Sequence, residues 1–467
     1  MGLSTQRSFP TKAWNLYVFL VFIALVFLLG GGARHDLQSL LILRPLAALA
    51  LGYGVFMTTR KTLERYNFLF ALLILTAILL VTHLVPLAPG VQNQLPQGEI
   101  LHEINKTGGI SPEPWRPLSL VPPATLNALF SLLIPAATLF LLSNLQREQF
   151  RPILLLMIAI GFVSALLGVL QILGPIKGPF YLYRITNDGL PVGLFSNRNH
   201  QAVFLSCMFP LLAAYSCSFL KAPEQLQRRK WFALGVSVIL VPMILMTGSR
   251  AGLICGLLGL LSVPFIYHPP NLSVPKKRVT HSAARRWFER WGYHVFGALL
   301  LGVIVFGSIW FSRALAVDRL TGNDGDIRWG LWTATWNLGA QYMPFGSGAG
   351  SFVEVFQMAE ADSELRYQYV NHAHNDLLEV FLTTGLPGLL LVAAFCACWV
   401  RGIWNAWRQP LGGADPIARA GLVVTGLFLT ASLVDYPLRT PSLIALFIIG
   451  AVMMWPIVKP ATPLNGK

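Results

Sequence analysis

The chain has 467 residues, of which 54% are hydrophobic and only 12% are charged. This composition is far more apolar than that of a soluble domain and excludes one. The formal net charge of +15 at pH 7 would suit a nucleic-acid-binding protein, so the distribution of the basic residues has to be considered before their number.

About twelve apolar runs are near the length that crosses a bilayer, which predicts an all-α, polytopic integral membrane protein. The runs cover residues 15–31, 37–57, 67–85, 124–143, 152–173, 200–220, 231–247, 251–268, 293–311, 376–400, 417–434 and 440–458. Arg7 and Lys12 precede the first run, as in a signal peptide, but no small-residue cleavage site is obvious. We therefore expect an uncleaved first helix.

The basic residues cluster in alternate connections between the runs. If the N-terminus is cytoplasmic, the cytoplasmic connections hold the groups Arg60, Lys61 and Arg65, and Arg228 and Arg229. This is the positive-inside pattern, and it predicts a multi-pass membrane protein with both termini in the cytoplasm. The basic excess then marks orientation and contacts with membrane lipids, and we expect no nucleic-acid partner.

We expect one membrane domain over residues 1–467 with two sizeable segments on the outer side. The first outer loop, 86–123, is rich in proline and glycine, which predicts irregular structure. The second is a large periplasmic segment, 312–375, before the tenth span. In it, Trp329, Trp332 and Trp336 share one helical face. That face could lie in the membrane interface or pack on the domain beneath it.

His372, His374 and Asn375 stand where the large outer segment enters the tenth span. A histidine at a helix N-terminus is held neutral by the helix dipole and can act as a general base. The alternative is that these are interfacial polar residues, with Asn375 or Asp376 capping the helix. Further along, Gly385 and Gly388 would allow a close helix approach or a bend within the membrane.

Two more polar groups begin spans on the outer side. Arg250 follows Thr247, Gly248 and Ser249 at a new helix start, where free amides and a guanidinium would suit a phosphate. Arg198 and Asn199 open the sixth span and could bind sugar hydroxyls or phosphate. The alternatives are a snorkelling arginine at 250 and a simple helix start with Asn199 as the cap.

Three other patterns support weaker interpretations. The stretch 435–439, Asp-Tyr-Pro-Leu-Arg, could pair internally or line a cavity. The glycine-rich stretch 346–350 has no strand–helix–strand unit around it, so we expect a flexible turn rather than a nucleotide loop. Asp324 and Asp326 have the spacing of a metal-binding pair, but short acidic pairs are common in loops and we expect no metal site.

Together these segments resemble the O-antigen ligase family, which also contains O-antigen polymerases. The resemblance rests on His374-Asn375 followed after nine residues by Gly-x-x-Gly, on the TGSR segment ending at Arg250, on DIRWGLW around Arg328, and on the GxFxNxN pattern from Gly193. It implies a membrane glycosyltransferase of GT-C-like helical architecture that needs no metal or cofactor. The donor would be an undecaprenyl-diphosphate-linked glycan and the acceptor a hydroxyl on the periplasmic face.

The resemblance also implies roles for individual residues. His374 would take the acceptor proton, while Arg250 and Arg328 would stabilise charge on the departing diphosphate. Arg198, Asn199, His372 and Asn375 would help to bind substrate. A single base with no second catalytic carboxylate would fit in-line attack with inversion at the anomeric carbon.

The identity of the acceptor separates the possible activities. Lipid A core as acceptor would make the protein an O-antigen ligase, a growing lipid-linked chain would make it an O-antigen or exopolysaccharide polymerase, and a protein hydroxyl would make it an O-oligosaccharyltransferase. A membrane transporter is the alternative from another class. Transporters carry charges near the midplane of several spans, whereas here the titratable residues gather at the outer mouth and Arg44 is the main charge inside a run.

Overall fold

The computed structural model describes residues 11–270, 302, 324–360, 370–410 and 415–458. Seven of the described helices are long and apolar enough to cross a membrane, and four shorter apolar helices accompany them. Together they correspond to every predicted run except 293–311, which lies outside the described residues apart from residue 302. The prediction of an all-α, polytopic membrane protein is therefore confirmed.

Contacts between Cα atoms divide the chain into two compact units. Unit 1 comprises residues 1–150, 325–406 and 428–467. Unit 2 comprises residues 151–324 and 407–427. Each unit is described by itself below, and the single membrane domain over residues 1–467 stays a prediction.

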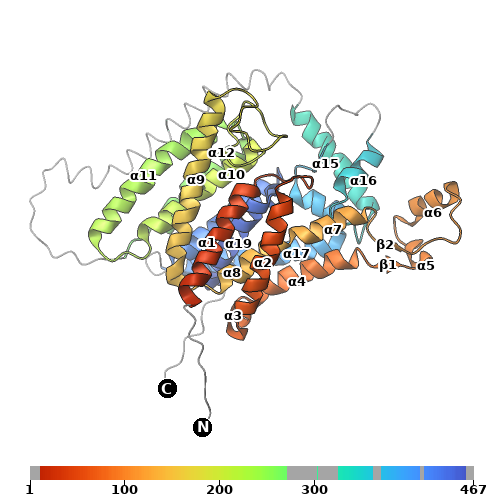
Figure 1. The fold of residues 1–467 in the computed structure, drawn as a ribbon, viewed down its shortest axis with the longest axis horizontal. Coiled ribbons are helices and arrows are strands. Elements are labelled where there is room, and N and C mark those ends of the chain that lie inside the picture. Colours follow the sequence, from red (N-terminus) through yellow and green to blue (C-terminus); the bar gives the residue numbers. More distant parts are fainter. Residues whose placement is uncertain (1–10, 271–301, 303–323, 361–369, 411–414, 459–467) are drawn as a thin grey trace, which may run out of the picture. The chain divides into compact units, whose positions relative to one another are not determined.

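Unit 1 is built around helices that pack in the order α1–α2–α8–α19, with α1 also touching α8 and α19. These helices lie side by side in Figure 1. The helices of the unit are α1 (Thr11–Leu29), α2 (Leu40–Met57), α3 (Arg60–Arg65), α4 (Asn67–Thr82), α7 (Pro122–Ser131), α8 (Leu133–Ser143), α15 (Asp324–Gln341), α16 (Phe352–Ala359), most of α17 (Asp376–Arg408) and α19 (Pro441–Val458). Two short 3-10 turns, η1 (Arg147–Gln149) and η3 (Pro437–Arg439), complete the unit.

Unit 2 has α10 as its core, because every residue in the apolar window of that helix is buried. Helices α11, α12 and α13 pack against α10. The unit contains α9 (Phe150–Leu173), α10 (Arg198–Cys217), α11 (Pro223–Met246), α12 (Arg250–Leu261) and α13 (Val263–Ile266), together with the greater part of α18 (Pro416–Ser432). In Figure 1, α9 to α12 form the yellow and green group.

The helix starts follow local sequence signals. Proline occupies the first turn of α7 and α11, where its missing N–H costs no hydrogen bond. Side-chain oxygens of Asn197 and Ser249 cap α10 and α12 by accepting hydrogen bonds from Asn199 N and Gly252 N. At α10 the cap is therefore Asn197 and not Asn199, as the alternative interpretation held.

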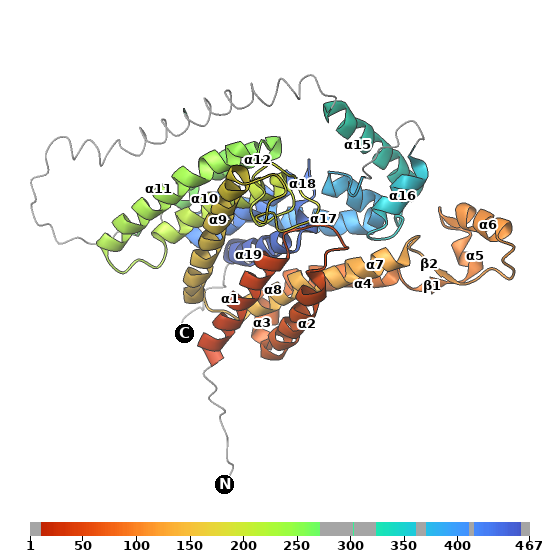
Figure 2. The ribbon, with the colours of Figure 1, turned by 45° about the horizontal axis from the view of Figure 1, so that its top comes forward.

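The first outer loop is more ordered than predicted. It holds an antiparallel pair, β1 (Pro86–Leu87) and β2 (Arg116–Pro117), and two helices, α5 (Pro89–Gln92) and α6 (Gly98–Thr107), which project from α4 and α7 in Figure 2. The prediction of irregular structure was wrong, because prolines and glycines here also start and end short helices, although Gly90 lies inside α5. Pro89 begins α5, and Gly108 ends α6.

Candidate active site

The mouth of α17 is fixed by Asn375. Its Oδ1 accepts hydrogen bonds from Leu377 N at 3.0 Å and Leu378 N at 3.1 Å, and its Nδ2 donates to Leu433 O at 2.9 Å. Of the two predicted caps, Asn375 is the one that caps the first amides of the helix. Both ends of this side-chain amide thus make hydrogen bonds inside the protein. They hold residues 372–375, here called the histidine loop, against the connection between α18 and α19.

His374 stands immediately before this cap with an unusual backbone. Its φ is +49°, in the left-handed region that non-glycine residues rarely adopt. Its Nδ1 lies 3.1 Å from Oδ1 of Asp435, and the two side chains are 29% and 2% exposed. An ionised carboxylate can only accept, so this contact places the proton of a neutral imidazole on Nδ1 and leaves the lone pair on Nε2.

His372 has its own carboxylate partner. Its Nδ1 lies 3.0 Å and 3.1 Å from the two carboxylate oxygens of Glu379, one turn inside α17. The same carboxylate accepts a hydrogen bond from Ala373 N at 3.1 Å. The His372 side chain is 15% exposed, about half the exposure of His374. His374 is therefore the more accessible of the two bases.

Arg439 joins the carboxylates of the first turn of α17. Its Nε donates to Asp376 Oδ1 at 3.3 Å, and its Nη2 lies 3.5 Å from Glu379 Oε1. Ser432 Oγ donates to the second oxygen of Asp376 at 2.7 Å. Burial lowers the pKa of Arg439, but the carboxylates of Glu379 and Asp376 more than offset this and hold the pKa above its usual value. The guanidinium is thus a fixed positive charge between two carboxylates.

Tyr436 lies against both histidines. Its ring centroid is 4.3 Å from that of His372 and 4.9 Å from that of His374, in the second case nearly edge-on. The tyrosine is buried, so its ring packs the two imidazoles into fixed orientations. The two charged residues of the stretch 435–439 pair with the histidine loop and the start of α17. No hydrogen bond or ion pair in the described part of the chain joins them to each other, so the internal pairing that the sequence left open is not supported.

Helix α15 connects Arg328 to the same loop. Trp332, one turn after Arg328, donates from Nε1 to Ala373 O at 3.1 Å. Trp329 and Trp336 remain exposed, although Trp336 stacks on Phe381 with ring centroids 4.8 Å apart. Trp332 thus packs on the loop beneath, as one interpretation held, while the placement of this face in the membrane interface stays a prediction.

The Arg328 side chain is half-buried and has no hydrogen bond or ion pair with any other residue in the described ranges. The acidic pair at 324 and 326 opens α15, and its side chains lie outside the described part of the chain. Among the described residues, no group of three His, Cys, Asp or Glu side chains could hold a metal ion. Metal independence remains a prediction.

Helix α17 is broken at Gly385, where φ is +58° and ψ is −148°. The loop 344–350 fills the break: Leu386 N donates to Pro344 O at 2.8 Å, and Gly348 N donates to Thr383 O at 2.9 Å. A side chain at Gly385 would collide with Pro344 O. The bend predicted at these glycines is confirmed, but the flexible turn predicted at 346–350 is wrong. The loop is largely buried because its backbone pairs with the interrupted helix.

In unit 2, the starts of α10 and α12 lie together. Gly252 packs so closely on Ala202 that a Cβ would collide with it, and Ser206 Oγ contacts Gly252 O at 3.4 Å. Gly259, two turns further along α12, packs on the backbone of Ser206, so the two helices run in the same direction. Arg198 and Arg250 therefore share one end of unit 2 with two helix N-termini, whose dipoles favour an anion.

The start of α12 is only partly as predicted. The amide of Gly252, expected to be free, donates to Ser249 Oγ at 2.9 Å. Arg250 is exposed, and its guanidinium has no hydrogen bond or ion pair with any other residue that the structure describes. Asn199 is half-buried in the first turn of α10. The anion-binding feature at this end is thus the arginine and the helix dipoles, with fewer open amides than expected.

A comparison with protein families finds a similarity in the central segment of the chain. Residues 235–393 match the model of the O-antigen ligase family. The match covers 159 of the 467 residues, so it is a similarity of this segment to the family. The resemblance inferred from the sequence is thereby confirmed, although no curated protein matches the chain.

The matched segment includes Arg250, Arg328 and the histidine loop, but it begins after Arg198 and ends before the Asp435–Arg439 stretch. The family implies a membrane glycosyltransferase that acts on a lipid-linked glycan and a glycan acceptor. The partners that the structure adds to the histidines, Asp435 and Tyr436, therefore lie beyond the matched segment.

Sequence reasoning missed the carboxylates beside the histidines. It expected one base and no catalytic carboxylate, whereas Glu379 and Asp435 each contact a histidine. A signal for Glu379 was present, because Asp376 and Glu379 stand three residues apart at the start of an otherwise apolar span. Asp435 carried a weaker signal, as a lone acidic residue between the last two spans.

Proposed function

We propose that the protein is an O-antigen ligase-type glycosyltransferase. It moves a glycan from an undecaprenyl-diphosphate donor to a hydroxyl of lipid A core on the periplasmic face of the inner membrane, with inversion and without a metal. The observation that carries the proposal is the pairing of His374 Nδ1 with Asp435, at 3.1 Å. It leaves the lone pair of Nε2 as the base, on a side chain that is 29% exposed.

The reaction is a single displacement. His374 Nε2 takes the proton of the acceptor hydroxyl while its oxygen forms a bond to the anomeric carbon. The bond from that carbon to the diphosphate oxygen breaks, and the electron pair leaves with the diphosphate. Asp435 stabilises the imidazolium that forms, as a buried carboxylate does for a histidine base.

We assign the departing diphosphate to Arg250 and Arg328. Both guanidiniums lack partners among the described residues, and a planar fork suits phosphate oxygens. Arg439 is a poor candidate for this role because Asp376 and Glu379 already occupy it. Arg198, Asn199 and His372 would make further contacts to phosphate or sugar, and Asn375 would support the loop.

The acceptor is tested by supplying the purified full-length protein with a lipid-linked glycan and one of three acceptors. These are lipid A core, a second lipid-linked glycan, and an unfolded protein rich in serine. Transfer to lipid A core supports the proposal if NMR shows that the anomeric configuration of the new linkage is inverted relative to the donor. Transfer to a lipid-linked chain or to protein would instead identify a polymerase or an O-oligosaccharyltransferase of the same family. Glycan-independent solute flux without transfer would favour a transporter.

A further inference from the structure

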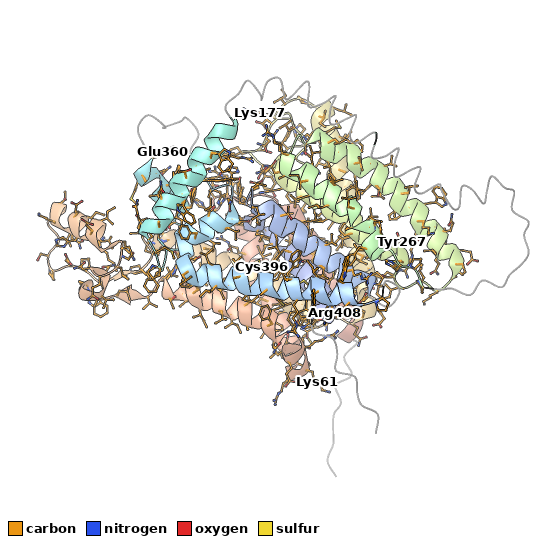
Figure 3. All side chains as sticks on the ribbon, turned by 180° about the vertical axis from the view of Figure 1, so that it is seen from behind. Lys61, Lys177, Tyr267, Glu360, Cys396 and Arg408 are labelled. Atoms are coloured by element: carbon orange, nitrogen blue, oxygen red, sulfur yellow. The ribbon has the colours of Figure 1, made fainter. Side chains whose placement is uncertain are left out.

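A cavity of about 590 Å³ opens where helices α4, α17 and α19 of unit 1 meet, far along α17 from the histidine loop. Its volume lies within the range of ligand pockets, about 300 to 1,000 Å³. The side chains that define its character are Phe68, Ala397, Cys398, Arg401 and Trp455. Figure 3 labels Cys396, which marks this stretch of α17, and Lys61, which extends from the tip of α3.

The walls of the cavity are apolar. The small side chain of Ala397 leaves the space open, and Trp455 closes one side by stacking on Phe68, with ring centroids 5.9 Å apart and planes 13° apart. The Trp455 indole N–H donates to Arg65 O, which fixes the ring. Such a rigid hydrocarbon wall in a membrane protein suits an acyl chain.

Aromatic and basic residues indicate the depth of the cavity in the membrane. Trp404, exposed one turn beyond Arg401, and Trp455 are side chains of the kind that gather where a membrane meets water. Arg65 follows Lys61 at the end of the α2–α4 connection, which the positive-inside pattern predicts to be cytoplasmic. Arg401 lies 25 residues after Asp376. Because α17 is broken at Gly385, the straight part is the 16 residues from there to Arg401, and at about 1.5 Å per residue they cover about 24 Å, most of a hydrocarbon core.

Arg401 gives the cavity its charge. It is exposed at the rim, and no hydrogen bond or ion pair joins its guanidinium to another residue of the described part. The lining contains no carboxylate. Glu64, the nearby acidic residue of α3, is already paired with Arg60 at 2.8 Å. An apolar slot with one unpaired guanidinium at headgroup level complements a phosphate diester that carries acyl chains.

We propose that this cavity binds one anionic phospholipid of the inner leaflet, with its phosphate on Arg401 and the upper part of an acyl chain against Trp455 and Ala397. The site does not depend on glycan transfer. General attraction of basic loops to the membrane would not fix the number of bound lipids. This site instead binds one lipid per protein, and a side chain that fills the cavity should abolish that binding.

Native mass spectrometry of the purified full-length protein tests the site. Phosphatidylglycerol and phosphatidylcholine with identical chains are titrated separately. The variants are Arg401→Gln, which removes the charge, and Ala397→Trp, which fills the slot. Lys61→Gln is the matched control, because it removes a basic residue of the same unit that does not line the cavity. Thermal unfolding of each variant confirms that it is folded.

We expect one phosphatidylglycerol to bind in preference to phosphatidylcholine, with Arg401→Gln lowering the affinity about fivefold to tenfold, as for loss of one interfacial cation. Ala397→Trp should abolish the single bound lipid, and Lys61→Gln should retain it. Inorganic phosphate should not displace it, because it lacks the chain. Equal binding of both lipids, equal losses in Arg401→Gln and Lys61→Gln, or displacement by phosphate would each overturn the proposal.

Discussion

The imidazole of His374 and the carboxylate of Asp435 are in hydrogen-bond contact, with 3.1 Å between Nδ1 and Oδ1, although 61 residues separate them in the chain. Two spans, α17 and α18, lie between them in sequence. With an ionised carboxylate at Nδ1, a neutral imidazole carries its proton there and keeps the lone pair of Nε2, as a general base requires. Four predictions test the chemistry that we assign to this arrangement, and one tests its stability.

We expect His374→Ala to abolish glycan transfer while the protein stays folded in the membrane. Loss of a general base costs about a hundredfold to ten-thousandfold in rate. His372→Ala is the matched variant, since it removes the neighbouring imidazole and its carboxylate pairing, and it should lose less. Rates of transfer to lipid A core by the purified variants provide the measurement. Near-normal turnover in His374→Ala with a large loss in His372→Ala would exchange their roles.

Asp435→Asn keeps the size of the side chain but replaces a carboxylate that can only accept with an amide that can also donate. The imidazole of His374 is then no longer held in one tautomer, so we expect kcat to fall by about tenfold to a hundredfold. The KM for the donor should change little, because the Asp435 side chain is 2% exposed and acts through its contact with His374. A rise in KM at constant kcat would show that the residue acts in binding.

Arg250→Lys and Arg328→Lys keep the positive charge but replace a planar fork by a point donor. Each should lose much of the transfer activity, because two parallel hydrogen bonds to phosphate oxygens are no longer possible. Arginines that only anchor the chain at the interface would be replaced by lysine at little cost. Transfer rates at matched membrane levels, with donor binding measured alongside, separate these cases; wild-type rates in both variants would leave the mechanism resting on His374.

Removal of divalent ions should leave turnover unchanged, because we assign the leaving diphosphate to guanidinium groups. The assay is repeated after dialysis against EDTA, and again after Mg²⁺ or Mn²⁺ is restored. Loss of activity that either ion reverses would move attention to Asp324 and Asp326. Asp324→Asn would then be expected to reproduce the loss.

Glu379→Gln should weaken the fold of unit 1 as well as the loop. Glu379 is 2% exposed and contacts both His372 and Arg439, so the neutral amide leaves Arg439 with one carboxylate and removes an acceptor from the loop. We expect a loss of about 1–3 kcal/mol in the free energy of unfolding. Glu64→Gln, which alters an exposed pair with Arg60, should cost less than about 1 kcal/mol. Equal effects in thermal or denaturant unfolding would contradict the buried network.

Much of the architecture was predictable because it depends on local composition. Apolar runs of spanning length specify helices wherever the backbone must satisfy its own hydrogen bonds in lipid, and every described run is a helix. Gly385 was predictable for the same reason, since a glycine pair inside an apolar run permits a bend. The first outer loop was not, because proline and glycine mark both irregular loops and the ends of short helices.

The sequence by itself determined the membrane class, the spans, the family segment and the polar residues at the mouth of α17. The tertiary structure decided which of these residues act on one another. Asp435 becomes the partner of His374 only when the start of α17 and the α18–α19 connection meet. The same packing pairs Arg439 with Asp376 and Glu379, so this arginine is not open to bind a phosphate. Hydrophobic periodicity reports burial along one segment, whereas a hydrogen bond across 61 residues depends on how separate helices pack.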